Sequence, residues 1–196
     1  MENSQDGKSF SHRKNLRLPD FDYSQNGAYF ITIVTSNRMN FFGKIGNGEM
    51  ILNDAGEMID DVCRKISWFI PHVEFSLHQV MPNHLHTIVV IEQGLSFDKR
   101  NIEDHRQIKF LDGNEQLNLS TGGLISLSQV IQRFKSFTTH LYIEGVIRLN
   151  WPRFDNRLWQ RNYYEHVIRN ERDHEAIADY ILCNPQNWEE DKEFNG

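Results

Sequence analysis

The tripeptide His84-Leu85-His86 stands at the head of a run of apolar and β-branched residues, 87–91. A run of this composition is typical of a buried strand. Alternate residues of a strand share a face, so both imidazoles point the same way while Leu85 points into the opposite layer. Two imidazoles on one face can bind a divalent metal if a third ligand comes from elsewhere. The tripeptide alone favours two half-exposed polar positions over a metal site, so other parts of the chain must decide.

The hydrophobic pattern predicts an alternation of strands and helices along the chain. Strands are expected at 28–34, at 73–80, at the histidine segment from 84 and within 158–168, with a hairpin in 41–52. Helices are expected from the N-cap Asn53 to about 69, from about 126 onward, and from the cap Asp173 to Asn184, before Pro185. This order predicts an α+β fold with an antiparallel sheet of four to five strands and helices packed mainly on one face.

Length and charge divide the chain into a core and three polar segments. A chain of 196 residues suits a single domain, 1–196, with a basic arm at 1–26, a polar insertion loop at 93–123 and an acidic tail at 189–196. The net charge of −6 argues weakly against a nucleic-acid partner, but residues 133–172 carry an excess of arginine. Arginine is well suited to bidentate phosphate contacts, so this segment favours a phosphate-rich partner.

Cysteine usage and the absence of apolar segments predict a cytoplasmic protein. Cys63 and Cys183 form no CxxC pair and are interpreted as buried thiols in a reducing compartment. No apolar stretch follows the basic residues near the N-terminus, and no segment reaches the length of a membrane span. We therefore expect neither a signal peptide nor a membrane contact.

The last expected helix offers two side chains with useful chemistry. Tyr180 and Asn184 are four residues apart, so they lie on one face about one turn from each other. Each has an ordinary structural interpretation, as a core tyrosine and as a helix-ending asparagine. Together with two histidines, however, an amide oxygen can complete a site for Mg²⁺ or Mn²⁺ that leaves positions open for phosphate oxygens. A phenol at such a site can attack phosphorus, although its pKa of about 10 means that it needs help to lose its proton.

Four stretches of the sequence resemble one known family. They are 80–86, which contains the histidines, then 17–23 leading into 27–33, then 159–171, and finally 180–185. Together they resemble the REP-associated tyrosine transposases of the single-tyrosine HUH transposase superfamily. They span nearly the whole chain in the expected order. The resemblance implies the HUH endonuclease fold, which is similar to that of ferredoxins and RRM domains.

The resemblance also implies roles for individual residues. His84, His86 and Asn184 would be the ligands of Mg²⁺ or Mn²⁺, and Tyr180 would be the nucleophile. The family acts on single-stranded DNA near hairpins and leaves a 5′-phosphotyrosine and a free 3′-OH. Tyr163 and Tyr164 compete for the role of nucleophile by residue type, but they lack the one-turn relation to Asn184.

Contacts with DNA are predicted from residue type and position. Candidates for phosphate contacts and for base stacking are Arg13, Lys14, Arg17, Arg133, Lys135, Arg161 and Arg169, and Trp159 and Tyr163. Three alternatives stay open: a hairpin-binding protein without catalysis, a nuclease of the replication-initiator or relaxase kind, and, least favoured, a structural zinc site. Both a monomer and a homodimer are compatible with the sequence.

Overall fold

The computed structural model describes residues 25–92 and 125–194. Its main sheet is antiparallel, in the strand order β4-β5-β1-β6. The strands are β1 (Gly27–Val34), β4 (Val73–Val80), β5 (His84–Ile91) and β6 (Tyr164–Ile168). Strand β5 is central and nearly all its residues are buried, which explains why its sequence is apolar on both faces.

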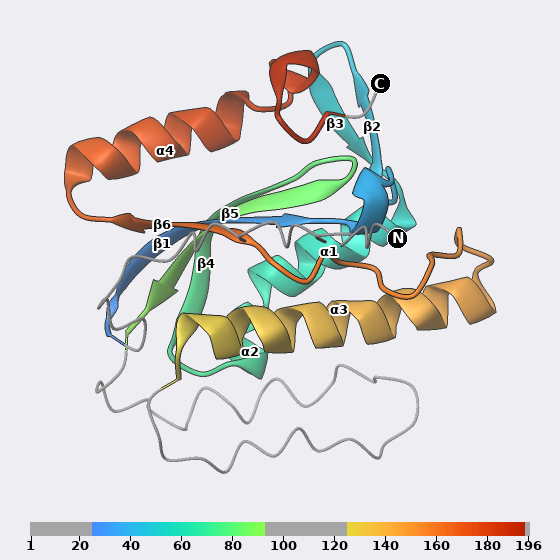
Figure 1. The fold of residues 1–196 in the computed structure, drawn as a ribbon, viewed down its shortest axis with the longest axis horizontal. Helices are drawn as coiled ribbons and strands as arrows, with labels where there is room; N and C mark the ends of the chain where they lie inside the picture. Colours follow the sequence, from blue (N-terminus) through green and yellow to red (C-terminus); the bar gives the residue numbers. More distant parts are fainter. Residues whose placement is uncertain (1–24, 93–124, 195–196) are drawn as a thin grey trace, which may run out of the picture.

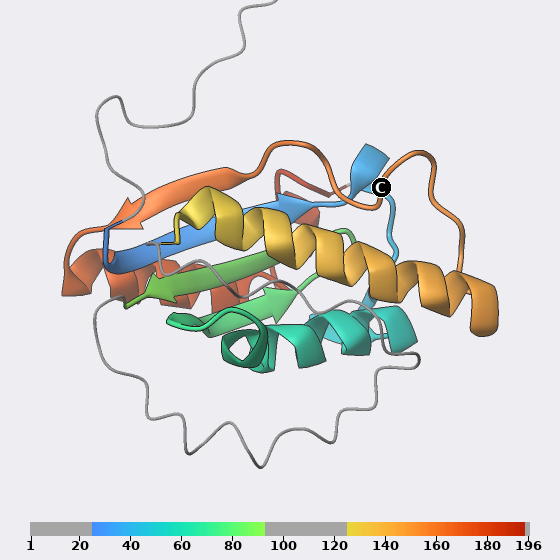
Figure 2. The same cartoon turned by 90° about the horizontal axis from the view of Figure 1, so that it is seen from below.

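Three helices cover one face of the sheet, and a fourth covers the other face (Figures 1 and 2). The first face carries α1 (Asp54–Arg64), α2 (Ile66–Phe69) and α3 (Leu127–Arg148), and the second carries α4 (Glu171–Cys183). The predicted α+β fold, with four strands and helices mainly on one face, is therefore confirmed. No helix within the described ranges is both long enough and apolar enough to cross a membrane.

The two faces differ in how much apolar surface they bury. The large core lies between the sheet and helices α1 and α3, and it includes Leu85, Val89 and Phe134. Under α4 the cluster of buried apolar residues consists of Phe30, Ile88 and Ile181. Because burial of apolar surface is the main stabilising term, the first face holds the fold together. The second face has room for polar side chains.

Local signals set most helix ends and the hairpin. The side chain of Asn53 accepts a hydrogen bond from Gly56 N at 2.9 Å, as the predicted N-cap of α1. Ser126 and Gln129 form a capping box at the start of α3. The predicted hairpin consists of β2 (Gly43–Gly46) and β3 (Glu49–Leu52), and both turn residues between them have positive φ, as a type I′ turn requires.

Three predicted details are corrected by the structure. The expected helix from 53 to 69 breaks at Lys65, whose φ of −106° and ψ of 11° leave the helical region. The last strand, β6, lies within its expected range, and residues before Tyr164 pair through the Thr35–Trp159 bridge. Cys63 is buried as expected, but Cys183 is exposed.

The N-cap of α4 is Asn170 rather than Asp173. The Asn170 side chain accepts a hydrogen bond from Asp173 N at 3.0 Å, so the helix starts earlier than expected. The Asp173 carboxylate instead accepts from Arg169 N at 3.3 Å and binds the His166 ring at 3.0 Å. The His166 hydrogen bond is the main cause that lowers the pKa of Asp173.

Candidate functional site

Strand β5 presents His84 and His86 on the face that α4 covers. In the sheet they lie opposite Val34 and Thr32 of β1. Both imidazoles are buried, and their Nε2 atoms lie 2.9 Å apart. The i, i+2 spacing in the sequence therefore becomes a pair of rings whose inner nitrogens converge on one point.

The outer nitrogen of each ring has a fixed partner. His84 Nδ1 lies 2.9 Å from Asn83 Oδ1, and because an amide oxygen only accepts, we assign the proton to Nδ1. His84 Nε2 then accepts from His86 Nε2, and His86 Nδ1 accepts from the Thr32 hydroxyl at 2.9 Å. The hydroxyl can also accept, so Thr32 supports the His86 tautomer that leaves its Nε2 free for a metal.

Burial keeps His84 neutral. Desolvation, and then the neighbouring His86, hold the pKa of His84 well below its usual value. A neutral imidazole has a lone pair to donate, which a metal ligand requires. The histidine that the sequence predicts as a ligand is thus in the correct protonation state at neutral pH.

The C-terminal end of α4 brings Tyr180 and Asn184 to the histidines. Tyr180 is 46% exposed, and its ring packs against His86 and edge-on against Phe30, with centroids 5.2 and 5.8 Å away. Asn184 is 2% exposed, and its Oδ1 has no hydrogen-bond partner among the described residues. A buried amide oxygen without a partner is costly unless another group binds it.

A fifth group at the site, the carboxylate of Asp191, was not predicted from the sequence. The short 3-10 helix η4 (Trp188–Glu190) turns the chain back toward the sheet, and the Asp191 side chain is 2% exposed. Asp191 Oδ2 accepts hydrogen bonds from Asn184 Nδ2 at 2.8 Å and from the Tyr180 hydroxyl at 3.2 Å. It also lies 3.8 Å from His86 Nε2. In the sequence, Asp191 belongs to an acidic run that is typical of a solvated tail.

The ionisation of Asp191 and Tyr180 is set by this environment. Burial raises the pKa of Asp191, but His86, the Asn184 amide and the backbone N–H of Glu193 stabilise the carboxylate more and hold the pKa well below its usual range. Burial, followed by the Asp191 charge, raises the pKa of Tyr180 to about 12. In this state the proton therefore stays on the phenol, which donates to Asp191.

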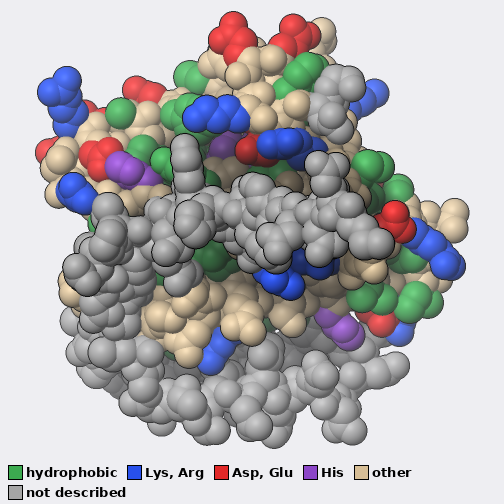
Figure 3. All heavy atoms as spheres, viewed as in Figure 1, with side chains coloured by type: hydrophobic (Ala, Val, Ile, Leu, Met, Phe, Trp, Pro, Cys, Tyr) green, Lys and Arg blue, Asp and Glu red, His purple; other side chains and the backbone are tan. Residues whose placement is uncertain are grey.

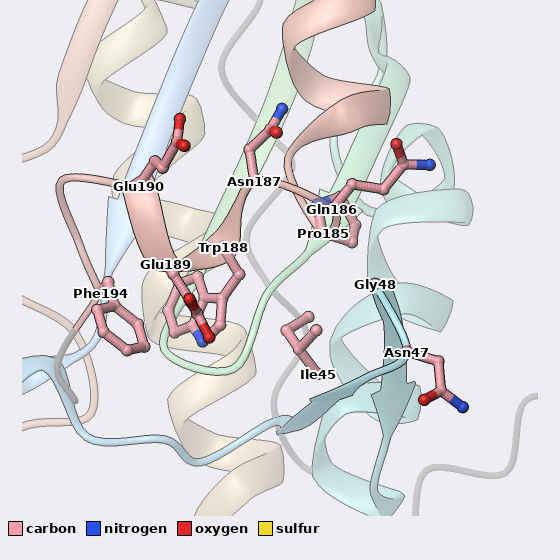
Figure 4. A pocket seen from close by; sticks show the side chains of 10 residues that line it. All are labelled: Ile45, Asn47, Gly48, Pro185, Gln186, Asn187, Trp188, Glu189, Glu190 and Phe194. Carbon is pink, nitrogen blue, oxygen red and sulfur yellow. The ribbon is translucent and has the colours of Figure 1, made fainter.

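The tail that carries Asp191 is anchored by aromatic contacts. The ring of Trp188, 8% exposed, lies 5.7 Å from His84 and 5.3 Å from Phe194. Figure 4 shows Trp188 between Phe194 and Ile45, at a shallow hollow on the outer side of the tail. The packing of Trp188 on His84 holds the acidic segment against the sheet.

These donors fit a divalent cation. The ligand atoms of His84, His86 and Asp191 lie within 4.8 Å of one another, and Asn184 Oδ1 is a fourth candidate donor. Two ligands at right angles around a metal with bonds of about 2.1 Å lie about 3 Å apart, close to the separation of the two Nε2 atoms. The oxygen donors suit Mg²⁺ or Mn²⁺, and the absence of thiolates argues against a structural zinc site.

Two of the residues predicted to contact DNA are used inside the protein. Trp159 is 4% exposed and donates from Nε1 to the Thr138 hydroxyl at 2.9 Å, so it offers no free face to a base. Lys135 Nζ donates to the carbonyl oxygens of residues 160–162, at 2.9 to 3.3 Å. Burial lowers the pKa of Lys135 to about 8. Both side chains are engaged where α3 packs beneath this loop, and their predicted DNA contacts stay predictions.

The other predicted DNA contacts remain predictions. Arg161 and Arg169 are exposed, Arg133 is half-buried, and Tyr163 lies under the Lys135 ammonium, which is 5.3 Å from its ring centroid. Tyr164, on the exposed edge strand β6, is 46% exposed and lies edge-on to Phe30. Residues 13, 14 and 17 and the predicted loop 93–123 lie outside the described residues. The acidic tail is described as far as residue 194.

Comparison with known proteins places the chain among relatives. An uncharacterized protein of Haemophilus influenzae is 36% identical over 182 residues, 92% of each chain. This chain belongs to the same family as that protein. No family model matches the chain.

A solved structure of a REP-associated tyrosine transposase bound to a REP hairpin superposes with a TM-score of 0.51. It is 20% identical and covers 84% of this chain and 70% of its own. This chain has the REP-associated tyrosine transposase fold. The resemblance carried by the sequence motifs is thus confirmed at the level of the fold, including its antiparallel sheet. A candidate transposase from Deinococcus radiodurans is more distant, with a TM-score of 0.46 and 13% identity over 85% of this chain and 95% of its own.

Proposed function

We propose that this protein is a metal-dependent endonuclease and strand transferase, a transposase, which cuts single-stranded DNA beside a hairpin through Tyr180. One observation carries the proposal. The Tyr180 hydroxyl is bound to the carboxylate that borders two histidines with converging Nε2 atoms. A hydroxyl nucleophile beside a set of metal-binding side chains suits phosphoryl transfer.

We assign His84, His86 and Asn184 as ligands of Mg²⁺ or Mn²⁺, with Asp191 as a further donor. The unpartnered Oδ1 of Asn184 supports its assignment. The bound ion would supply positive charge against the negative charge that develops on the phosphate. Asn83 and Thr32 would orient the two imidazoles through their outer nitrogens.

In the proposed reaction, Tyr180 Oη forms a bond to phosphorus and the bond from phosphorus to the 3′ oxygen breaks. The 3′ oxygen takes up a proton and leaves as a 3′-OH, while the phenol proton passes to water or to Asp191 Oδ2. The product is a 5′-phosphotyrosine, which keeps the bond energy for rejoining to another DNA end. Tyr180 is half exposed above buried histidines, so a DNA strand can reach it from outside.

The DNA partner is proposed from the solved neighbour, which is bound to a REP hairpin. Single-stranded or hairpin DNA would reach the site over the α4 face of the sheet, where both Tyr180 and Tyr164 are exposed. The basic arm, 1–26, would add phosphate contacts. Both a monomer and a homodimer remain compatible with the proposal.

A second candidate function is hairpin-DNA binding without catalysis. The observation that favours it is the hydrogen bond that the Tyr180 hydroxyl donates to Asp191 Oδ2 at 3.2 Å, which engages the phenol with a carboxylate in this arrangement. This candidate predicts DNA binding that is indifferent to metal and to the Tyr180 hydroxyl. The two candidates therefore differ in a single covalent product.

The test incubates the protein with Mn²⁺ and 5′- and 3′-labelled hairpin DNA taken from the sequences flanking its gene. We expect the strand 3′ of the cut to migrate at protein mass on a denaturing gel. Tyr180→Phe should abolish that product and keep DNA binding, whereas the control Tyr164→Phe should keep the product. Covalent attachment by Tyr180→Phe would show that the nucleophile is another residue. Binding without any covalent product, with Mn²⁺ and with Mg²⁺, would favour the second candidate.

A further inference from the structure

A polar hollow lies at the end of β1, away from the metal-binding side chains. It forms between the 3-10 turn η1 (Ser36–Arg38) and the loop that leads from α3 to β6. It is lined by Ser36, Asn37, Arg38, Asp155, Asn156, Arg157, Gln160 and Arg161. The lining consists of guanidinium, amide, hydroxyl and carboxylate groups and contains no apolar side chain.

The hollow carries a positive charge. Its three arginines outnumber Asp155, its one carboxylate, and Arg38 is paired with Glu193 at 2.8 Å. Arg157 and Arg161 are exposed, and neither forms an ion pair with another residue in the described ranges. On the face drawn in Figure 3, visible basic side chains are scattered among acidic ones.

Both walls of the hollow have unusual backbone conformations. Asn37, Arg38 and Asn156 have φ values of 56°, 52° and 58°. Asparagine tolerates this region, but a long side chain such as that of Arg38 rarely adopts it. The surrounding hydrogen bonds fix the conformation of Arg38, because its carbonyl accepts from Asn83 Nδ2 at 3.2 Å. The loops are thus held in one shape, which suits a binding site.

The same hydrogen bonds connect the hollow to the candidate metal site. Asn83 donates to the Arg38 carbonyl and accepts from His84 Nδ1 at 2.9 Å. Gln160 N donates to the carbonyl of Val34 at 2.8 Å, and Val34 lies opposite His84 in the sheet. The hollow and the histidines therefore both adjoin the C-terminal end of β1.

We propose that this hollow binds the sugar-phosphate backbone of the single strand whose scissile phosphate lies at His84 and His86. Arg157 and Arg161 each bind a phosphate, and the amides of Asn37, Asn156 and Gln160 bind sugar or base edges. The inference rests on the proposed function, because it assumes that the substrate is single-stranded DNA. It adds to the proposed function a binding site for the part of the DNA strand that lies next to the scissile phosphate.

The test measures binding of labelled oligothymidylate and of the flanking hairpin DNA over a range of salt concentrations. The protein is Tyr180→Phe in EDTA, so neither metal nor chemistry contributes. Arg157→Ala combined with Arg161→Ala should weaken binding and reduce the slope of log K against log salt by about 1.4, about 0.7 for each lost phosphate contact. Replacing both arginines by lysine should restore most of the slope, because the charges return.

The matched control removes two exposed arginines outside the hollow, Arg153 and Arg172. It has the same net charge as the double alanine variant and should change the slope by less. An unchanged slope in the hollow variant, or an equal loss in the control, would overturn the proposal. Cleavage by the wild type together with an unchanged slope would leave the proposed function standing. A reduced slope in a protein that makes no phosphotyrosine would instead contradict the proposed function and keep the DNA-binding hollow.

Discussion

At the scale of single residues, the candidate site depends on side chains that hold one another in place. Asp191 Oδ2 accepts hydrogen bonds from Tyr180 and from Asn184, which are one helical turn apart. The Asn184 amide group is thereby oriented with its Nδ2 toward the carboxylate, and its Oδ1 is left for another partner. Asp191 therefore orients Asn184, and we propose that it is also a donor to the cation.

Replacing Asp191 by alanine should lower the affinity for Mn²⁺ by about 10- to 100-fold, the usual effect of losing a group that orients or supplements metal ligands. Calorimetric titration with Mn²⁺ measures this change. The control is Glu190→Ala, because Glu190 is exposed and belongs to the same acidic run. Equal Mn²⁺ affinity in wild type and Asp191→Ala would exclude Asp191 from the metal site.

At the scale of elements, the loop from α3 to β6 is held by the ammonium group of Lys135, a residue that was predicted from the sequence to contact DNA. Lys135 of α3 donates to three successive carbonyl oxygens of this loop, and Gln160 N continues the contact to β1. A loop without regular secondary structure needs partners for its backbone, and here an ammonium group supplies them. The same loop carries Arg157 and Arg161, so Lys135 supports the hollow from beneath.

Lys135→Met should keep the aliphatic packing and remove the three hydrogen bonds. Hydrogen bonds to a charged group contribute about 1.5–3 kcal/mol, so the free energy of unfolding should fall by about that amount. For a protein of this size, thermal unfolding should shift by roughly 2–4 °C for each kcal/mol. An exposed lysine, Lys44→Met, is the control for loss of charge. An unchanged melting temperature would show that the loop holds its shape without Lys135.

At the scale of the whole molecule, one face of the sheet carries most of the apolar core and the other carries the candidate site. Helices α1 and α3 close a large apolar core on one face, whereas α4 covers a small cluster and the polar site on the other. Leu85 and the two histidines alternate along β5, so one strand contributes to both faces. The large core holds the sheet, and the sheet in turn positions the histidines.

Substitutions on the two faces should therefore have different effects. Leu85→Ala, in the large core, should cost about 2–5 kcal/mol of unfolding free energy. Ile181→Ala, under α4, should cost near the lower end of that range, because its small cluster can collapse. It should nevertheless weaken Mn²⁺ binding more, because α4 carries Asn184. Thermal unfolding and Mn²⁺ titration of both variants measure the two effects, and equal losses of Mn²⁺ affinity would contradict this division.

Local sequence patterns predict the strands, the helices and the candidate residues that share a face, because each of these signals depends on residues close together in the chain. The run after His86 predicts a buried strand, Asn53 predicts a cap, and the spacing of Tyr180 and Asn184 predicts one helix face. Each depends on residues within a few positions of one another, where periodicity and capping have a fixed geometry.

Which polar groups meet depends instead on contacts between residues that are far apart in the sequence. Asp191 reaches Tyr180 through a chain turn whose direction no local pattern encodes. The hollow beside Arg157 likewise forms between two turns that are far apart in the sequence. In the same way, the burial of Trp159 and Lys135 depends on where α3 packs, and their residue types alone suggest exposed DNA contacts. An acidic tail and a basic loop have the same composition whether they are solvated or folded against a sheet. Long-range packing selects between these states, because it decides which charges lose water and gain partners.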